Sequence, residues 1–199
     1  RQKEGIDYTE TFAPVIRYES VRVFLALSVH LSLRVHQFDV KTAFLNSDID
    51  TEVFVKQPPG FSDSTHPDWV WKLHRGMYGL KQAPLLWNEH INDSLLDIGF
   101  IRHPGENGLY FHHSRDGLVI LGLYVDDILV AAPSDRTLDY VKTALFEIYH
   151  MKDLGPVSKF LGLNIHQQHD GSISLTLADY IASAAASSDI PLHLSLIHI

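Results

Sequence analysis

The feature that most constrains this fold is the stretch LGLYVDDILVAA (121–132), in which two aspartates interrupt an apolar run. Carboxylates are rarely buried unless a counter-charge, hydrogen bonds or a metal ion compensate them. The flanking residues favour two strands, so we expect Asp126 and Asp127 at or near a hairpin turn. Asp is also a common turn former. Without further partners, an ordinary acidic turn is therefore the simpler interpretation.

A third aspartate occurs in a matching context. Asp39 follows Phe38 near the end of a predicted strand, RVHQFDV (34–40). Three carboxylates from neighbouring strands would form an all-oxygen site suited to Mg²⁺ or Mn²⁺. Two such ions, about 3.5–4 Å apart, are the usual device for phosphoryl and nucleotidyl transfer. The three acids together therefore predict a metal-dependent transferase site.

Hydrophobic periodicity predicts short strands alternating with longer helices. This order favours a two-layer α+β domain. The predicted helices cover 19–33, 84–98 and 135–150, and the clearest strands cover 34–40, 109–113, 118–125 and the DILVAA segment after Asp126.

Composition narrows the classes of function. The net charge of −8 argues against a nucleic-acid-binding module without chemistry. Residues 82–151 carry ten acidic and four basic side chains, so the excess surrounds the aspartate pair, where a bound cation would offset it. The absence of cysteine excludes disulfides and thiolate zinc sites. No apolar run reaches the roughly 18 residues that span a bilayer, so we expect no membrane partner.

The thirteen histidines do not change this picture. HH at 112–113 and HQQH at 166–169 have spacings that would suit a metal ion. No second cluster completes a tetrahedral set, and we interpret these histidines as surface or packing residues.

Taken together, the motifs resemble the reverse transcriptase of copia-type (Pseudoviridae) LTR retrotransposons. The resemblance runs from residue 1 to about 180 and follows the order of motifs in that family. The motifs are GIDYTETFAPV (5–15), QFDVKTAFLN (37–46), VKQPPGF (55–61), GMYGLKQAPLLW (76–87), LYVDDILV (123–130) and MKDLGPVSKFLGLNI (151–165).

The resemblance implies an α+β fold of the reverse-transcriptase palm type, an antiparallel sheet backed by helices, with an incomplete fingers lobe. Residues 1–180 would form fingers and palm, with the fingers truncated at the amino terminus and the thumb absent. Residues 181–199 would be a truncated carboxy-terminal segment. Its last six residues, LSLIHI, do not resemble the family, and we expect them to be a sequence artefact.

The activity implied by the resemblance is that of an RNA-directed DNA polymerase with two Mg²⁺ (or Mn²⁺) ions. In this chemistry the primer 3′-hydroxyl attacks the α-phosphate of a deoxynucleoside triphosphate. Asp39 and Asp126 match the principal metal ligands, and Asp127 matches a lesser ligand. The backbone carbonyl of Val40 would complete the site of the leaving-group metal.

The resemblance also assigns residues around the metals. Phe44 matches the aromatic that packs under the sugar and rejects a 2′-hydroxyl. Gln82 would lie against the incoming nucleotide, with Lys81 as a weaker candidate. Lys152 matches a lysine that protonates pyrophosphate. The hairpin that grips the primer end would contain Phe160, Leu161 and Gly162.

Each assignment has a structural alternative. Phe44 is also consistent with a core aromatic, and Lys152 with a solvated lysine at a helix end. Gln82 would serve as well to satisfy a loop backbone. Tyr124 fits either a core position or a primer-facing one. Asp39 and Asp126 are the firmest assignments, because no other interpretation explains both acids in apolar strand contexts.

The partners implied by the resemblance are an RNA/DNA template-primer, deoxynucleoside triphosphates, and the integrase and ribonuclease H regions of a Pol polyprotein. The implied location is a virus-like particle in the cytoplasm of a eukaryotic host. Two other classes remain open. One is a truncated or decayed remnant without activity, and the other is a non-catalytic nucleic-acid-binding module, whose binding would survive Asp39→Asn.

Overall fold

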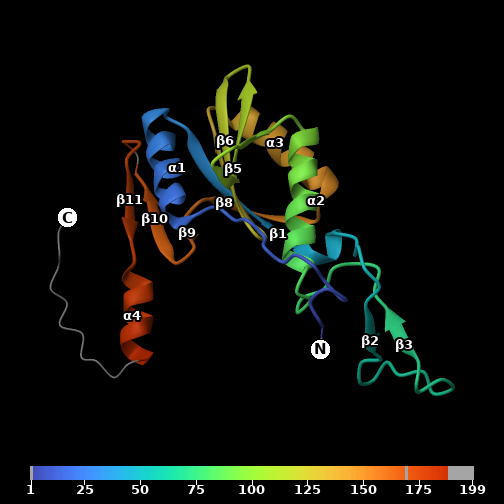
Figure 1. Ribbon diagram of the computed structural model, residues 1–199. Coiled ribbons are helices and arrows are strands. Elements are labelled where there is room, and N and C mark those ends of the chain that lie inside the picture. Colours follow the sequence, from blue (N-terminus) through green and yellow to red (C-terminus); the bar gives the residue numbers. More distant parts are fainter. Residues whose placement is uncertain (1, 169, 188–199) are drawn as a thin grey trace.

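The computed structural model describes residues 2–168 and 170–187. Its centre is a six-stranded antiparallel sheet with the strand order β4-β5-β6-β7-β1-β8 (Figure 1). The strands are β1 (Arg34–Val40), β4 (Ile101–His103), β5 (Glu106–Ser114), β6 (Gly117–Tyr124), β7 (Asp127–Ala132) and β8 (Met151–Pro156).

Both faces of this sheet are covered. Helices α2 (Ala83–Asp97) and α3 (Asp135–Ile148) pack on one face. Helix α1 (Tyr18–His30) and a three-stranded sheet cover the other face (Figure 1). The three-stranded sheet has the order β11-β10-β9, formed by β9 (Lys159–Phe160), β10 (Leu163–Gln167) and β11 (Ile173–Thr176).

Burial on both faces explains the apolar run noted in the sequence. A strand between two apolar layers carries no polar face, so it reads as continuous hydrophobic sequence rather than as an alternation. On β7, Ile128 and Val130 pack into the core that contains α2 and α3. Leu129 and Ala131 pack into the core that contains α1. Asp127 is the first residue of this strand and Asp126 directly precedes it, at the end of the sheet.

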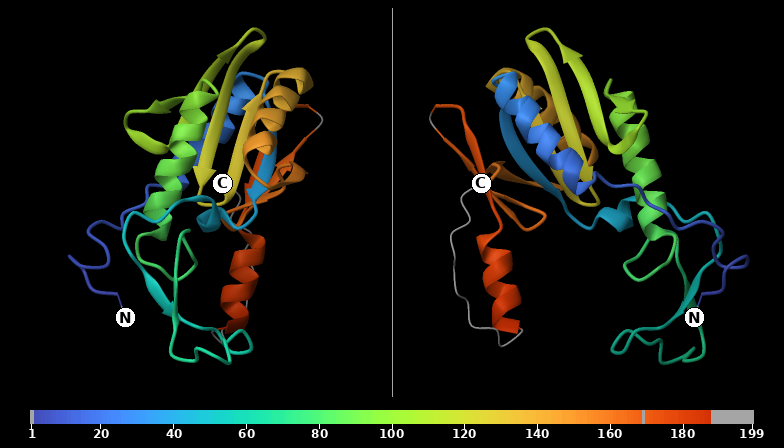
Figure 2. Two further views of the ribbon diagram at one scale, coloured as in Figure 1. Left: turned by 90° about the vertical axis from the view of Figure 1, so that its right-hand side faces the viewer. Right: turned by 60° about the vertical axis from the view of Figure 1, so that its left-hand side comes forward.

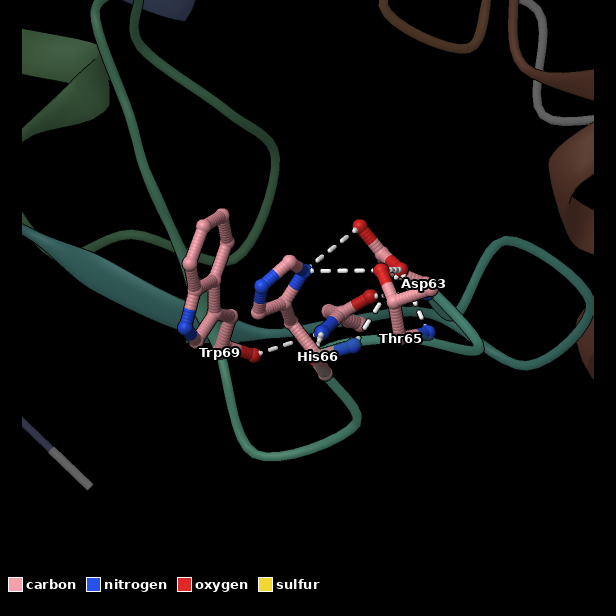
Figure 3. A network of polar contacts seen from close by, with 5 residues as sticks. Asp63, Thr65, His66 and Trp69 are labelled. Carbon is pink, nitrogen blue, oxygen red and sulfur yellow. Dashed lines mark hydrogen bonds and ion pairs between the residues drawn. The ribbon is translucent and has the colours of Figure 1, made fainter.

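A separate two-stranded arm projects from the fold. It pairs β2 (Phe54–Lys56) with β3 (Val70–Lys72), and the residues between them form a long loop. The Nε2 amide of Gln57 closes this loop by donating to the carbonyls of His66 and Trp69, each at 2.9 Å. The His66 ring stacks on Trp69 with 3.8 Å between ring centroids, beside the Asp63 and Thr65 contacts (Figure 3). The loop is thus ordered by its own side chains.

The arm and helix α4 (Ala178–Ser187) lie beyond one end of the central sheet (Figure 2). This is the end at which β6 turns into β7, opposite the turn that joins β5 to β6 (Figure 1). Between β1 and the arm, a short 3-10 turn, η1 (Ala43–Asn46), begins after Thr42. The elements around the β6–β7 turn therefore come from widely separated parts of the chain.

The predicted mixed α/β character is confirmed, with the main sheet antiparallel and helices on both faces. The sequence did not predict β4, β8 or α4. On β8 only Met151 is buried, because β8 is an edge strand, and its exposed residues show no apolar periodicity. Helix α4 also runs across the boundary expected after residue 180. The segment 188–199, including LSLIHI, lies outside the described residues.

Within residues 2–168 and 170–187, no helix is long and apolar enough to cross a bilayer.

Candidate active site at the end of the central sheet

Asp126 lies in a tight turn between β6 and β7. Tyr124 and Asp127 are cross-strand partners, which leaves Val125 and Asp126 as the two turn residues. Val125 has a φ of +54°, a conformation that is costly for a β-branched side chain. The turn is held from two sides. The indole Nε1 of Trp87 donates to the Val125 carbonyl at 2.7 Å, and the Val40 N–H donates to the Asp126 carbonyl at 2.8 Å.

Four side chains form a row across the end of the sheet. Tyr124 on β6 pairs with Asp127 on β7, Asp127 pairs with Asp39 on β1, and Asp39 pairs with Lys152 on β8. Direct partners in an antiparallel sheet project from the same face, with Cβ atoms about 4.5–5.5 Å apart. Two carboxylates therefore lie on adjacent strands, with an aromatic ring on one side and an ammonium group on the other.

The acids interact through their charges. Burial is the largest cause of a raised pKa at Asp127, and the negative charges of Asp126 and Asp39 raise this pKa further. A hydrogen bond opposes them, because the Nε2 amide of Gln37 donates to Asp127 Oδ1 at 3.0 Å. The two-residue strand period places Gln37 on the same face as Asp39. Gln37 was not predicted as a partner of the acids, although this period was a signal for it.

The donor set fits Mg²⁺ that is shared with a phosphorylated substrate. Among the residues that the structure describes, no three His, Cys, Asp or Glu side chains converge closely enough to hold a metal ion by themselves. Magnesium is usually bound by one or two carboxylates together with substrate phosphates, rather than by an all-protein cage. The opposed pair Asp39 and Asp127, with Asp126 in the adjacent turn, supplies such carboxylates and carries mutual repulsion that a cation would relieve.

An aromatic pair lies beside the acids. Phe44, on η1, packs its ring against Tyr78 with 4.5 Å between centroids and an angle of 51°. The pKa of Tyr78 is raised by burial first and then by the charges of Asp126 and Asp39, while a hydrogen bond from the Ala43 backbone opposes the shift. Phe44 also packs against the core that contains α2 and α3. Tyr78 was not identified from the sequence, because it lies in a loop without periodicity.

In the structure, the side chain of Gln82 forms hydrogen bonds inside the fold. Its side chain is 2% exposed. Its Nε2 amide donates to the Asp7 carbonyl at 3.0 Å and to Thr51 Oγ1 at 3.2 Å, and its Oε1 accepts from Gln2 at 2.8 Å. The side chain thus satisfies loop groups, as the structural alternative proposed. Nucleotide contact by Gln82 stays a prediction.

Lys81 is exposed and lines an open hollow of about 610 Å³ with Gln2 and Phe54. Its backbone N–H donates to the side chain of Gln2 at 2.8 Å. The ammonium group of Lys81 therefore faces an accessible surface, and its contact with a nucleotide also stays a prediction.

The remaining predicted residues lie on β8 and in the small sheet. Lys152 is exposed on an edge strand rather than at a helix end. Phe160 is buried among residues of the core that contains α1. Leu161 and Gly162 form the turn between β9 and β10, with φ values of +48° and +81°. The turn is therefore anchored by a buried ring directly before it, and its contact with a primer stays a prediction.

Comparisons with known proteins identify the family of this chain. The family described as reverse transcriptase (RNA-dependent DNA polymerase) matches residues 1–191. A protein of transposon Ty5-1 from Saccharomyces cerevisiae is 62% identical over 152 residues, which cover 76% of this chain and 49% of that protein.

Two plant relatives are more distant. The retrovirus-related Pol polyprotein from transposon TNT 1-94 of Nicotiana tabacum is 38% identical over 82% of this chain. The corresponding polyprotein from transposon RE1 of Arabidopsis thaliana is 34% identical over 95% of this chain. The chain spans 12% and 13% of these two polyproteins.

Proposed function

This chain belongs to the copia-type members of the reverse transcriptase family, and from that premise we propose that Asp39, Asp126 and Asp127 form its nucleotidyl-transfer site. The observation that carries the proposal is the direct cross-strand pairing of Asp39 with Asp127, beside the turn that holds Asp126. The reaction is extension of a primer by deoxynucleotides on an RNA or DNA template.

In this proposal, Asp39 and Asp126 are the principal Mg²⁺ ligands, with Asp127 and the Val40 carbonyl as further ligands. Bound Mg²⁺ supplies charge stabilisation at the reacting phosphate and lowers the pKa of the attacking hydroxyl. The Val40 and Trp87 hydrogen bonds hold the acidic turn in place before substrate binds. Such preorganisation is a large part of catalysis by charge stabilisation. The exposed Lys152 Nζ, next to Asp39 in the row, donates a proton to the leaving pyrophosphate.

The fold supports a division into the parts of a polymerase. We assign the six-stranded sheet with α2 and α3 to the palm. The β2–β3 arm, beyond the same end of the sheet as the acids, is part of the fingers (Figure 2). The β9–β10 turn at Leu161 and Gly162 contacts the primer end. Phe44 contacts the nucleotide sugar, and Lys81 contacts the nucleotide from the open hollow that it lines.

We infer the longer protein, the substrates and the location of this chain from its family. The chain spans only part of its Pol relatives, which supports a place within a Pol polyprotein that also contains integrase and ribonuclease H regions. Its substrates are a template-primer and deoxynucleoside triphosphates. The reaction takes place in a virus-like particle in the cytoplasm.

Primer extension tests the proposed site. The enzyme is a longer polymerase that contains this chain and the regions beyond the matched segment of the Pol relatives. We expect Mg²⁺-dependent extension by the wild type and a loss of at least about a hundredfold in Asp39→Asn and Asp126→Asn, because each removes an anionic ligand at the reacting phosphate. The matched control is Asp139→Asn, an exposed aspartate on α3, which should extend at the wild-type rate.

The outcomes separate the three classes of function. If the wild type extends no primer, the polymerase proposal fails and an inactive remnant is favoured. If template-primer binding is retained while Asp39→Asn and Asp126→Asn change nothing measurable, a binding module without chemistry is favoured. Equal loss in Asp139→Asn would show that the effect does not depend on the acid row.

A further inference from the structure

Tyr78 is an exposed aromatic residue that is not part of the hydrophobic core. It lies in the loop between β3 and α2, and 53% of it is accessible to solvent. Its ring nevertheless packs on Phe44, with 4.5 Å between ring centroids. Phe44 in turn rests on the hydrophobic core. Phe44 therefore lies between the hydrophobic core and the partly exposed ring of Tyr78.

The pKa of the Tyr78 hydroxyl depends on burial and on the charges of the same site. Burial raises the pKa of this hydroxyl, and the backbone of Ala43, the first residue of η1, partly opposes that shift. The hydroxyl also lies within the electrostatic reach of Asp126 and Asp39. The Phe44–Tyr78 contact therefore brings this loop against η1, and the acidic turn is close enough for its charge to raise the pKa of Tyr78.

The backbone fixes this loop to η1. A Cβ at Gly76 would lie 2.5 Å from the Phe44 carbonyl oxygen, so only glycine permits this approach. The Gly76 N–H donates to the Ser47 carbonyl at 2.9 Å, and Ser47 Oγ donates to the Phe44 carbonyl at 3.0 Å. Tyr78, two residues later, is therefore placed against Phe44 by a short, tied segment rather than by a free loop.

We propose that Tyr78 is a positioning residue for sugar selectivity. Its ring holds Phe44 in the position from which Phe44 excludes a 2′-hydroxyl. This inference rests on the proposed polymerase function and on the sugar contact of Phe44. A side chain can exclude one hydroxyl group by steric contact only if its position is fixed within a fraction of an ångström. Phe44 on a four-residue turn would tilt away from the added hydroxyl if nothing supported its solvent side.

The test measures the ratio of kcat/KM for a deoxynucleotide to that for the matching ribonucleotide, in the longer polymerase used for primer extension. An aromatic pair of this kind is worth about a two- to tenfold change in an equilibrium. We therefore expect Tyr78→Ala to lower the selectivity ratio by about two- to tenfold. Tyr78→Phe, which keeps the ring, should restore it. Tyr140→Ala, at an exposed tyrosine on α3, is the matched control.

A double-mutant cycle separates support of Phe44 from a general loss of structure. If Tyr78 acts through Phe44, the double variant Phe44→Ala/Tyr78→Ala should be no less selective than Phe44→Ala alone. Unchanged selectivity in Tyr78→Ala, with normal deoxynucleotide extension, would overturn the inference and leave the polymerase function intact. A wild type without any extension would instead refute the proposed function, and the inference with it. Tyr78→Leu serves as the second variant if Tyr78→Ala does not fold.

Discussion

Asp39 on β1 and Asp127 on β7 lie directly opposite one another in the central sheet, so two carboxylates distant in the sequence share one face. Like charges placed directly opposite in a sheet are destabilising. The burial of Asp127 adds to this cost. The arrangement is therefore unfavourable for folding alone, and it is expected where the carboxylates bind a cation.

The first prediction concerns this repulsion. Asp127→Asn should raise the free energy of unfolding by a few tenths to about 1 kcal/mol at pH 7 in EDTA, because it removes one of the opposed charges. The amide keeps an Oδ1 acceptor for Gln37. Urea denaturation measures the change, with Asp139→Asn as the control. A lower stability in Asp127→Asn would contradict the electrostatic argument.

The second prediction concerns the support of the acidic turn. Trp87 is 1% exposed, and its indole N–H is the donor to Val125. Trp87→Phe removes this donor and leaves a cavity, so we expect a loss of about 2–4 kcal/mol in the free energy of unfolding. Trp71→Phe, at a 44% exposed site on the arm, should change stability by less than about 0.5 kcal/mol. Equal effects at the two sites would argue against a special role for Trp87.

The third prediction concerns Gly76. Gly76→Ala should lower the free energy of unfolding by about 1–3 kcal/mol, because the added methyl group meets the Phe44 carbonyl. It should also reduce sugar selectivity in primer extension, since it pushes the loop away from Phe44. At Gly105 the nearest atom to an added Cβ is 3.4 Å away, on the His103 ring. Gly105→Ala is therefore the matched control. A stable, fully selective Gly76→Ala enzyme would refute this packing argument.

The fourth prediction concerns His36, a half-buried residue on β1. Its Nδ1 is buried and has no hydrogen-bond partner among the residues that the structure describes. Burial is the main cause of its lowered pKa. The neighbouring Asp153 and Asp135 oppose that shift, and Lys142 and Arg34 add to it. Because the folded pKa lies below the unfolded value of 6.5, the unfolded chain binds a proton first as the pH falls.

Stability contributed by neutral His36 is therefore fully present above pH 6.5 and is lost as the pH falls towards the folded pKa. His36→Val should flatten the dependence of the free energy of unfolding on pH below 6.5. Thermal unfolding across a pH series measures this difference, and His113→Val, at an exposed histidine on β5, is the control. Parallel curves for the wild type and His36→Val would contradict the prediction.

Sequence patterns predicted the parts of the site that depend on local structure. The apolar strands around Asp126 and the strand that ends near Asp39 both occur in the structure. Their register does not follow from the sequence, because the pairing of Asp39 with Asp127 depends on contacts across the whole sheet. Edge strand β8 was not predicted because only Met151 on it is buried, so its sequence shows no apolar periodicity.

The missed site residues depend on contacts between distant segments. Tyr78 acquires its position from Gly76 and Phe44, which lie in different loops. The internal bonds of Gln82 likewise involve Gln2, Asp7 and Thr51, none of which is a neighbour in the sequence. Motif resemblance identifies residues of interest, but only the packed chain shows which of them are buried.

The central claim is that Asp39, Asp126 and Asp127 bind divalent cations. A Mn²⁺ titration of this chain, followed by paramagnetic broadening of its amide NMR signals, locates this binding residue by residue. We expect broadening to begin at Asp39, Val40, Asp126 and Asp127. We also expect Asp126→Asn to weaken binding at least about tenfold, while Asp139→Asn does not. Broadening centred elsewhere, or equal affinity in Asp126→Asn and the wild type, would contradict the claim.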